Sequence, residues 1–286
     1  LQQQNKIIGV QSDDKGVDKT GRMKANFAPG LNVYAKCTVL AEGARGSLSK
    51  QLVEAFSLDQ DCNPQAYGLG IKELWKLPAG RIQPGLVWHT LGYPCAPYTS
   101  VGGWLYAMQD QRVSLGLISG LHYAHPGFDP HRALQQFKCH PSIRKILAGG
   151  ELLHYGAKTL SQGGYWSMPK AYAPGALLIG DGAGLVDSLR LKGIHLAIKS
   201  GMLAAETVFA ALQTQDPANS LHSYADSLRN SWLQREMWAA RNHHQALQYG
   251  LMRGLWHVAL QRLTGGRGLY QRYKNKAAHA YFNSAL

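Results

Sequence analysis

The sequence is poor in acidic residues, has few cysteines and lacks any long apolar run. Its 17 Asp and Glu residues stand against 30 Lys and Arg, which gives a formal net charge of +13. No stretch approaches the roughly 20 uninterrupted apolar residues of a membrane-spanning helix, so an integral helical membrane protein is not expected. The 4 cysteines are isolated, at Cys37, Cys62, Cys95 and Cys139. Because none belongs to a C-x-x-C pair, they predict neither a zinc ribbon nor an iron–sulfur cluster, and a chain of this length needs no disulfide scaffold.

Motifs of several catalytic and nucleotide-binding classes are also missing. Without a G-x-S-x-G elbow, a Ser–His–Asp hydrolase is not indicated. The 12 histidines include His243–His244 and the pair His122 and His125, but no carboxylates stand at the spacing that a metal site needs. No G-x-G-x-x-G follows a predicted strand, so the half of a dinucleotide site that holds the pyrophosphate is not in this chain. We expect no metal site and no catalytic acid or base.

The residues that are present predict a folded protein with both sheets and helices. Apolar residues make up 45% of the chain, which excludes intrinsic disorder. Residues 6–11 and 32–41 predict two strands joined by a loop over 12–30. Ser47 is a suitable N-cap for a short helix over 47–56.

The middle of the chain changes character. From 66 to 121, short apolar runs alternate with Gly and Pro, a pattern typical of an antiparallel sheet. Asp129 followed by Pro130 indicates the start of a helix over 129–139. A buried strand over 176–179 is then followed by a glycine-rich turn. Apolar spacing predicts helices over 193–212, 220–248 and 250–264.

Two segments are candidates for binding chemistry. Gly180 and Asp181 follow the strand over 176–179, and Gly193 and Ile194 open the next helix. A carboxylate at such a turn can accept hydrogen bonds from sugar or ribityl hydroxyls, while the helix N-terminus offers N–H groups to an anion or a flavin carbonyl. The second segment is Ala35–Gly46, a strand that runs into Glu42–Gly43 and a helix. Ordinary strand-to-helix turns without a ligand are the alternative for both.

Several longer motifs resemble the electron-transfer flavoprotein–ubiquinone oxidoreductase family. The resemblance extends from about Gly16 to about Asn242. It lies in motifs that occur in the order AEGARGSLSKQL, YGLGIKELW, GRIQPGLVWHTLGYP, VGGWLY, KCHPSIRKILAGGELLHYGAKTLSQGG and GIHLAIKSGMLAAE.

The resemblance implies an electron-transport oxidoreductase with FAD in a two-dinucleotide-fold domain and ubiquinone at a sheet domain. Such enzymes take electrons from reduced electron-transfer flavoprotein and pass them to ubiquinone in the membrane. The family also carries a [4Fe–4S] cluster in a C-terminal domain, whose ligands are absent here. We therefore expect a fragment without the N-terminal G-x-G-x-x-G unit and the cluster domain. By itself this fragment is expected to bind FAD weakly or not at all.

The resemblance also implies roles for particular residues. Glu42 and Gly43 match the internal FAD motif. The remaining matches to the FAD site are Gly180, Asp181, Gly193 and Ile194. Gly102 and Gly103 match the glycine pair at the quinone headgroup. Asp181 stands where many members lack an acid, and Ile194 and Leu196 replace hydroxyl residues, so an altered flavin potential is expected.

The fold class implied is α/β (α+β), with a partial FAD domain interrupted by an antiparallel-sheet domain. The segments expected are a partial FAD-binding domain over 1–62, a ubiquinone-binding sheet domain over 63–165, the continued FAD-binding domain over 166–215 and a helical, membrane-contacting segment over 216–286.

The basic excess is concentrated near the C-terminus. After Glu236 the chain has no acidic residue, and its Arg and Lys residues alternate with apolar ones. This pattern favours an anionic membrane surface over nucleic acid. In the helix over 250–264 the membrane-contacting residues are expected to be Leu251, Leu255, Trp256 and Leu263; packing of this helix as ordinary core is the alternative. The protein is expected to be peripheral, on the cytoplasmic face of a bacterial inner membrane or the matrix face of the mitochondrial one.

Two other functions remain open at the level of sequence. One is a related flavin-dependent reductase of a prenyl lipid, of the geranylgeranyl reductase type. The other is a non-catalytic basic module that binds membranes.

Overall fold

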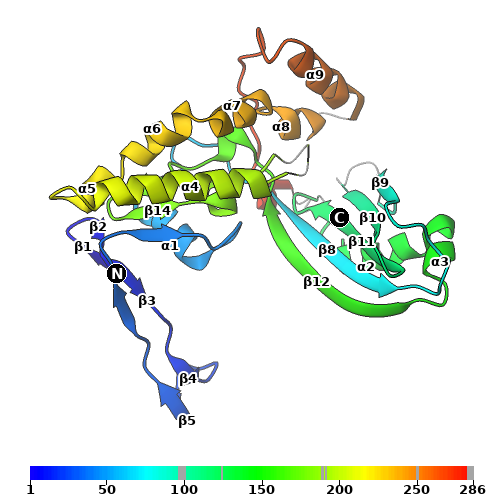
Figure 1. Cartoon of the computed structure of the whole chain (residues 1–286), viewed down its shortest axis with the longest axis horizontal. Coiled ribbons are helices and arrows are strands. Elements are labelled where there is room, and N and C mark those ends of the chain that lie inside the picture. Colours follow the sequence, from blue (N-terminus) through cyan, green and yellow to red (C-terminus); the bar gives the residue numbers. More distant parts are fainter. Residues whose placement is uncertain (96–100, 124, 188–189, 191, 249–250, 282–286) are drawn as a thin grey trace. The chain divides into compact units, whose positions relative to one another are not determined.

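The computed structural model describes residues 1–95, 101–123, 125–187, 190, 192–248 and 251–281 (Figure 1). The chain forms two compact units. Unit 1 comprises Leu1–Cys62 and Gly164–Arg272, and unit 2 comprises Asn63–Gly163 and the residues from Tyr273 on. The chain therefore passes between the units after Cys62, after Gly163 and after Arg272.

A small mixed sheet lies at the centre of unit 1. β14 (Ala176–Leu178) pairs in parallel with β7 (Thr38–Leu40) and antiparallel with β13 (Tyr172–Ala173). All three residues of β14 are completely buried, which explains why its sequence is continuously apolar instead of alternating. The strand expected over 176–179 is confirmed.

The helix expected over 193–212 is confirmed as α4 (Ile194–Ala211). By length and composition alone α4 is apolar enough to cross a membrane. In the structure one side of it, with Leu196, Leu203 and Ala204, packs into the core of unit 1.

Shorter helices follow α4 in unit 1 (Figure 1). They are α5 (Pro217–Ser220), α6 (Ser223–Asn230), α7 (Trp232–Ala239), α8 (His243–Gln248) and α9 (Leu251–Leu263). The single helix expected over 220–248 is wrong, because Ser231 has an extended backbone (φ −82°, ψ 163°) that ends α6 and begins α7. The helix expected over 250–264 is confirmed as α9, and Gly250 lies outside the described residues.

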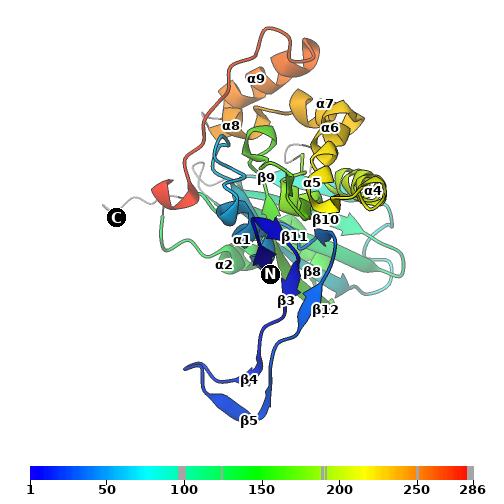
Figure 2. The ribbon, with the colours of Figure 1, turned by 90° about the vertical axis from the view of Figure 1, so that its left-hand side faces the viewer.

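The N-terminal strands of unit 1 are short and paired in hairpins. β1 (Gln2–Gln3) pairs with β2 (Lys6–Ile7), and β3 (Gly9–Gln11) pairs with β6 (Asn32–Tyr34). Between β3 and β6 the chain forms a further hairpin of β4 (Lys15–Val17) and β5 (Met23–Ala28), which extends away from the helices of unit 1 (Figure 2).

Three expectations about this region are wrong. The strand predicted over 6–11 is divided into β2 and β3, which belong to different sheets. The predicted loop over 12–30 contains β4 and β5, because the Asp18 carboxylate accepts hydrogen bonds from the N–H groups of Thr20 and Arg22 and so closes a tight turn. The strand predicted over 32–41 is divided into β6 and β7, which belong to different sheets.

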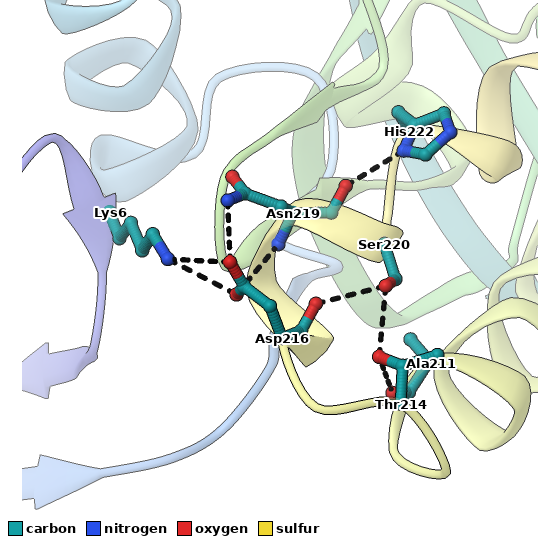
Figure 3. A network of polar contacts seen from close by, with 7 residues as sticks. All are labelled: Lys6, Ala211, Thr214, Asp216, Asn219, Ser220 and His222. Atoms are coloured by element: carbon teal, nitrogen blue, oxygen red, sulfur yellow. Dashed lines mark hydrogen bonds and ion pairs between the residues drawn. The ribbon is translucent and has the colours of Figure 1, made fainter.

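An ion pair fastens the N-terminal strands to the helical part of unit 1 (Figure 3). Lys6 Nζ lies 2.9 Å and 3.1 Å from the two carboxylate oxygens of Asp216. Asp216 is also the N-cap of α5, where its side chain accepts a hydrogen bond from Asn219 N–H. The hydrogen bonds from Lys6 hold the pKa of this carboxyl below its usual value.

Unit 2 is built on a five-stranded antiparallel sheet, which confirms the sheet expected over 66–121. The strand order is β12 (Glu151–Ser161), β8 (Tyr67–Lys76), β11 (Arg112–Gly120), β10 (Val101–Ala107) and β9 (Val87–Leu91). The helices α2 (Pro130–Lys138) and α3 (Pro141–Leu147) pack on one face, where Leu105, Leu115 and Phe137 form the core. Asp129 is the N-cap of α2, as expected.

The last described residues of the chain return to unit 2. Asn63 Nδ2 donates hydrogen bonds to the Tyr273 carbonyl (2.7 Å) and to Asn275 Oδ1 (3.1 Å). Asn275 Nδ2 in turn donates to the Pro64 carbonyl (3.0 Å). The two asparagines therefore join the start of unit 2 to its C-terminal segment.

Candidate functional site

The two candidate flavin motifs meet at one edge of the unit 1 sheet. In the parallel pair of β7 and β14, Leu40 stands opposite Leu178, and Ile179 N–H donates to the Leu40 carbonyl at 3.2 Å. Both strands therefore end together, and Glu42–Gly43 and Gly180–Asp181 emerge side by side. A Cβ placed on Gly182 would lie 3.5 Å from the Gly43 carbonyl oxygen, so the two turns are in contact.

Residues of α4 and α6 fix the turn after β14 by hydrogen bonds. Gly180 has a φ of 56°, which favours glycine, and its N–H donates to Ser200 Oγ at 3.0 Å. Ser200 Oγ donates to the Ala197 carbonyl at 2.8 Å, and Tyr224 Oη donates to the Ser200 carbonyl at 3.2 Å. Tyr224 is completely buried, and burial raises the pKa of its phenol. This network fixes the Gly180 backbone, and the sequence reasoning missed both Ser200 and Tyr224.

The start of α4 adjoins Asp181. Gly193 is the N-cap of α4 and, as a glycine, has no side chain of its own to cap the helix. A Cβ on Gly193 would lie 3.6 Å from Asp181 Oδ1, so the carboxylate lies close to the first turn of α4. The Ile194 side chain is 80% exposed. The structure thus brings Asp181, Gly193 and Ile194 together at the start of α4, where the first N–H groups of a helix have no partner within the helix and can donate to a carbonyl or an anion.

The loop before α4 is tied to α7 by charged residues. Asp187 is buried, lies 3.5 Å from Arg190 Nε, and pairs through its backbone with Lys192. Arg190 Nη1 and His195 Nε2 lie 3.3 Å and 2.9 Å from the same oxygen of Glu236. Sequence reasoning missed this network as well; the one signal was that Glu236 is the last acid of the chain.

Glu42 serves the neighbouring helix. Its carboxylate accepts hydrogen bonds from Ser49 N–H (2.7 Å), Ser49 Oγ (2.9 Å) and Leu48 N–H (3.3 Å) at the start of α1 (Ser47–Ala55). Burial tends to raise the pKa of Glu42, but the hydrogen bonds from Ser49 and Leu48 outweigh it and hold the pKa below its usual value. The N-cap of α1 is Gly46, so the expected cap at Ser47 is wrong.

Gly102 and Gly103 lie on opposite faces of the unit 2 sheet. A Cβ on Gly103 would lie 2.7 Å from Phe137 Cζ and 2.6 Å from Thr90 Oγ1, inside the packed core. A Cβ on Gly102 would meet only the Thr90 carbonyl oxygen, at 3.5 Å. Of the pair, Gly102 alone belongs to the face that α2 and α3 leave uncovered.

That open face carries aromatic side chains beside small residues. Trp104 and Tyr106 follow Gly102 on β10, and His89 and Leu91 stand opposite Trp104 and Gly102 on β9. His89 and Tyr106 meet edge to face with ring centroids 5.6 Å apart. Because Gly102 has no Cβ and only the Thr90 carbonyl oxygen would lie within 4 Å of one, a flat ring could approach the backbone there, next to apolar and aromatic side chains. Among the described residues, no group of three His, Cys, Asp or Glu could hold a metal ion.

Sequence comparison links the chain to named proteins. A sequence model described as "ETF-QO, ubiquinone-binding" matches residues 67–160, which run from β8 into β12. The electron transfer flavoprotein–ubiquinone oxidoreductase of Arabidopsis thaliana is 44% identical over 278 residues, covering 96% of this chain and 43% of that protein. The Homo sapiens enzyme is 44% identical over 243 residues, covering 82% and 39%. A probable enzyme of the same name from Acinetobacter baylyi is 41% identical over 267 residues, covering 87% and 47%.

Solved structures share the fold at low sequence identity. A geranylgeranyl bacteriochlorophyll reductase-like protein from Thermoplasma acidophilum superposes with a TM-score of 0.64 at 17% identity, covering 98% of this chain and 63% of that one. A flavin-dependent brominase superposes with a TM-score of 0.52 at 16% identity, covering 98% and 66%. The fold is thus one that flavoproteins use. The chain spans less than half the length of the three relatives named above, and it belongs to the electron transfer flavoprotein–ubiquinone oxidoreductase family.

Proposed function

We propose that this chain provides part of the FAD site and the quinone headgroup surface of an oxidoreductase that passes electrons from reduced electron-transfer flavoprotein to membrane ubiquinone. The observation that carries the proposal is the match of residues 67–160 to the ubiquinone-binding part of the family. A second support is that the parallel pairing of β7 and β14 in unit 1 brings the two flavin motifs together. When bound, FAD would supply the two-electron redox chemistry.

The residues at the sheet edge of unit 1 suit the ring and ribityl parts of FAD. Asp181 can accept hydrogen bonds from ribityl hydroxyls. The first N–H groups of α4 can donate to a ring carbonyl, and the positive end of the helix favours the negative charge of a reduced ring. Ser200 and Tyr224 keep the Gly180 turn in the shape that this requires. Glu42 and Gly43 act here through α1 and the contact with Gly182.

The quinone headgroup is assigned to the open face at Gly102. A planar ring can lie against the backbone there because no Cβ intervenes, and Trp104 and Leu91 flank it. Gly103 contributes indirectly, since its lack of a side chain lets Phe137 of α2 pack under the strand.

Attachment to the membrane is assigned to α9. Its side chains Met252, Leu255, Trp256, Leu260 and Leu263 are exposed, with Trp256 at 74% and Leu263 at 86%. The side chain of Leu251 lies outside the described residues. The 13 residues of α9 span about 20 Å at 1.5 Å per residue, less than a hydrocarbon core of about 30 Å, so α9 would lie along the surface.

The charge of this region suits anionic lipid. Arg253 and Arg262 on α9 and Arg267 beyond it are exposed, and no acidic residue follows Glu236. We place the protein as peripheral on the cytoplasmic face of a bacterial inner membrane or the matrix face of the mitochondrial one, with no role for nucleic acid.

A chimera tests the proposed function. This chain replaces the matching segment of the Acinetobacter baylyi relative, which supplies the rest of the family's length. The expected result is a protein with the visible spectrum of a bound flavin that reduces ubiquinone-1 with electrons from reduced electron-transfer flavoprotein, whereas the chain alone holds FAD weakly. A flavin-loaded chimera that leaves ubiquinone-1 oxidised but reduces a prenyl double bond would overturn the proposal in favour of a prenyl-lipid reductase.

A further inference from the structure

His89 stands next to the surface that the quinone headgroup would occupy. On the open face of the unit 2 sheet, Leu91 is paired with Gly102 and His89 with Trp104. His89 is therefore the diagonal neighbour of Gly102 on the adjacent strand, at a Cα separation of about 7–8 Å that long side chains can bridge. The imidazole is exposed.

Tyr106 holds the imidazole from one side. The Tyr106 hydroxyl lies 3.5 Å from His89 Nε2, at the outer limit of a hydrogen bond, and the two rings meet at 67°. Trp104 stands between Gly102 and Tyr106 along β10, and its ring centroid is 6.5 Å from that of Tyr106. The contact with Tyr106 orients the imidazole while leaving it accessible.

Other charged groups of this face lie on β11, β8 and β12. Arg112 is at the opposite end of β11 from Ile118, the residue paired with Gly102, and it stands opposite Lys76 of β8, which in turn pairs with Glu151 of β12. Lys72 stands on β8 opposite Gly116, while Lys158 and His154 stand on β12 opposite Gly70 and Leu74. β11 separates all three from β10. In the described parts of β9 and β10, His89 and Tyr106 are the only titratable side chains.

We propose that His89 donates a proton to one of the two quinone carbonyl oxygens, the one on the β9 side of Gly102. The inference rests on the proposed function, because the two electrons come from the reduced flavin. Quinone plus two electrons and two protons gives quinol: the imidazolium N–H bond breaks as an O–H bond forms on one quinone oxygen, and the second oxygen takes its proton from water. The exposed imidazole then regains its proton from solvent. Histidine is the side chain that most often serves as a general acid or base in enzymes.

The test separates proton-coupled from proton-free electron acceptors. In the flavin-loaded chimera, His89→Gln should lower kcat/KM for ubiquinone-1 by about 10²–10⁴-fold and remove the pH dependence of that step. The rate with the ferricenium ion, which takes one electron and no proton, should stay unchanged. Tyr106→Phe, which keeps the ring but loses the hydroxyl, should have a smaller effect. The matched control His154→Gln, on the same face at β12, should change neither rate.

A binding measurement on the 286-residue chain gives a second readout. The imidazole NMR signal that His89→Gln removes should shift when ubiquinone-1 is added, and the signal of His154 should not. If the parent chimera fails to reduce ubiquinone-1, the proposed function itself is wrong. If the parent reduces it and His89→Gln keeps the parent rate and pH profile, or the His89 signal ignores ubiquinone-1, only the assignment of His89 is overturned.

Discussion

Lys138, at the end of α2, forms a buried ion pair with Glu73 in the middle of β8. Lys138 Nζ lies 2.8 Å and 3.0 Å from the two carboxylate oxygens, and the Glu73 side chain is only 5% exposed. Trp75 Nε1 donates to the same carboxylate at 2.8 Å, and the Lys138 ammonium lies 5.3 Å from the Trp75 ring centroid. One carboxylate thus joins the helical layer of unit 2 to its sheet.

Removing the Glu73 charge should destabilise unit 2. Glu73→Gln leaves Lys138 buried without a counter-charge, which costs about 3–5 kcal/mol of unfolding free energy when a buried pair is broken. Urea unfolding followed by circular dichroism measures the loss. Glu151→Gln, an exposed carboxylate at the start of β12, is the control and should change stability by less than about 0.5 kcal/mol. Equal effects of the two variants would contradict a special role for this pair.

The two neighbouring glycines of β10 should respond differently to substitution. Gly103→Val forces a side chain against Phe137 and should lower stability by about 1–3 kcal/mol or more. Gly102→Val projects into open space and should keep the melting temperature while weakening ubiquinone-1 binding, measured as quenching of tryptophan fluorescence. The assignment of the headgroup surface fails if Gly102→Val binds ubiquinone-1 as the parent does.

Ser200 should matter for both stability and flavin binding. Ser200→Ala leaves the buried Gly180 N–H without its acceptor, at a cost of about 1–3 kcal/mol. Because the Gly180 turn loses its support, the affinity of the chimera for FAD should fall as well, measured by flavin fluorescence. Thr207→Val is the control: this residue is buried on the same helix and bonds to the Leu203 carbonyl, so it should affect stability but not FAD affinity.

Stability should fall between about pH 6.5 and pH 4 because of His243. Burial lowers the pKa of His243 from 6.5 to about 4; nearby Asp187 opposes the shift, while Arg262, Arg190 and His257 add to it. In that window the unfolded chain binds a proton that the folded chain does not, so stability is lost as the pH falls. His243→Leu should show a smaller drop in unfolding free energy between pH 7.5 and pH 5 than the parent. An identical drop would show that His243 does not titrate in this way.

Anionic vesicles test the role of α9. Leu255→Asp combined with Trp256→Asp should abolish co-sedimentation with anionic vesicles by placing charge on the apolar side of the helix. Both side chains are exposed, so the circular dichroism spectrum and solubility should stay as in the parent. Arg235→Gln, an exposed basic residue on α7, is a charge control that should keep most of the binding. Unchanged binding of the double variant, or its aggregation, would mean that α9 packs as core.

Local signals in the sequence predicted those elements that local interactions define. Asp129 and Pro130 specify the start of α2 by a side-chain cap and a fixed φ, both within the same turn. The apolar run of β14 reports burial on both faces. Residues 12–30 were misread because their turn depends on the Asp18 carboxylate, in a stretch whose polar composition resembles a loop.

The motifs of the candidate site could be predicted from the sequence, but the residues that hold those motifs in place could not. The motifs around Glu42 and Asp181 are legible in sequence, and the parallel register of β7 and β14 unites them. The supports depend on partners far along the chain, such as Ser200 with Gly180 and Glu236 with His195. Single-sequence periodicity carries no information about such pairs, and the same limit hid the capping role of Glu42, which acts from six and seven residues away.

The route of the chain between the two units has a consequence for cutting and rebuilding this protein. The chain crosses between the units three times, after Cys62, Gly163 and Arg272. The hydrogen bond between the Asn63 and Asn275 side chains holds the segment that follows the third crossing against the segment that follows the first. A protease that nicks any one crossing leaves two intact tethers, so the halves stay in one particle. Conversely, no single pair of cuts releases unit 2 as one piece. A protein of residues 63–163 alone lacks the hydrogen bond between Asn63 and Asn275. A circular permutant that fuses residues 273–281 ahead of Asn63 would restore that bond.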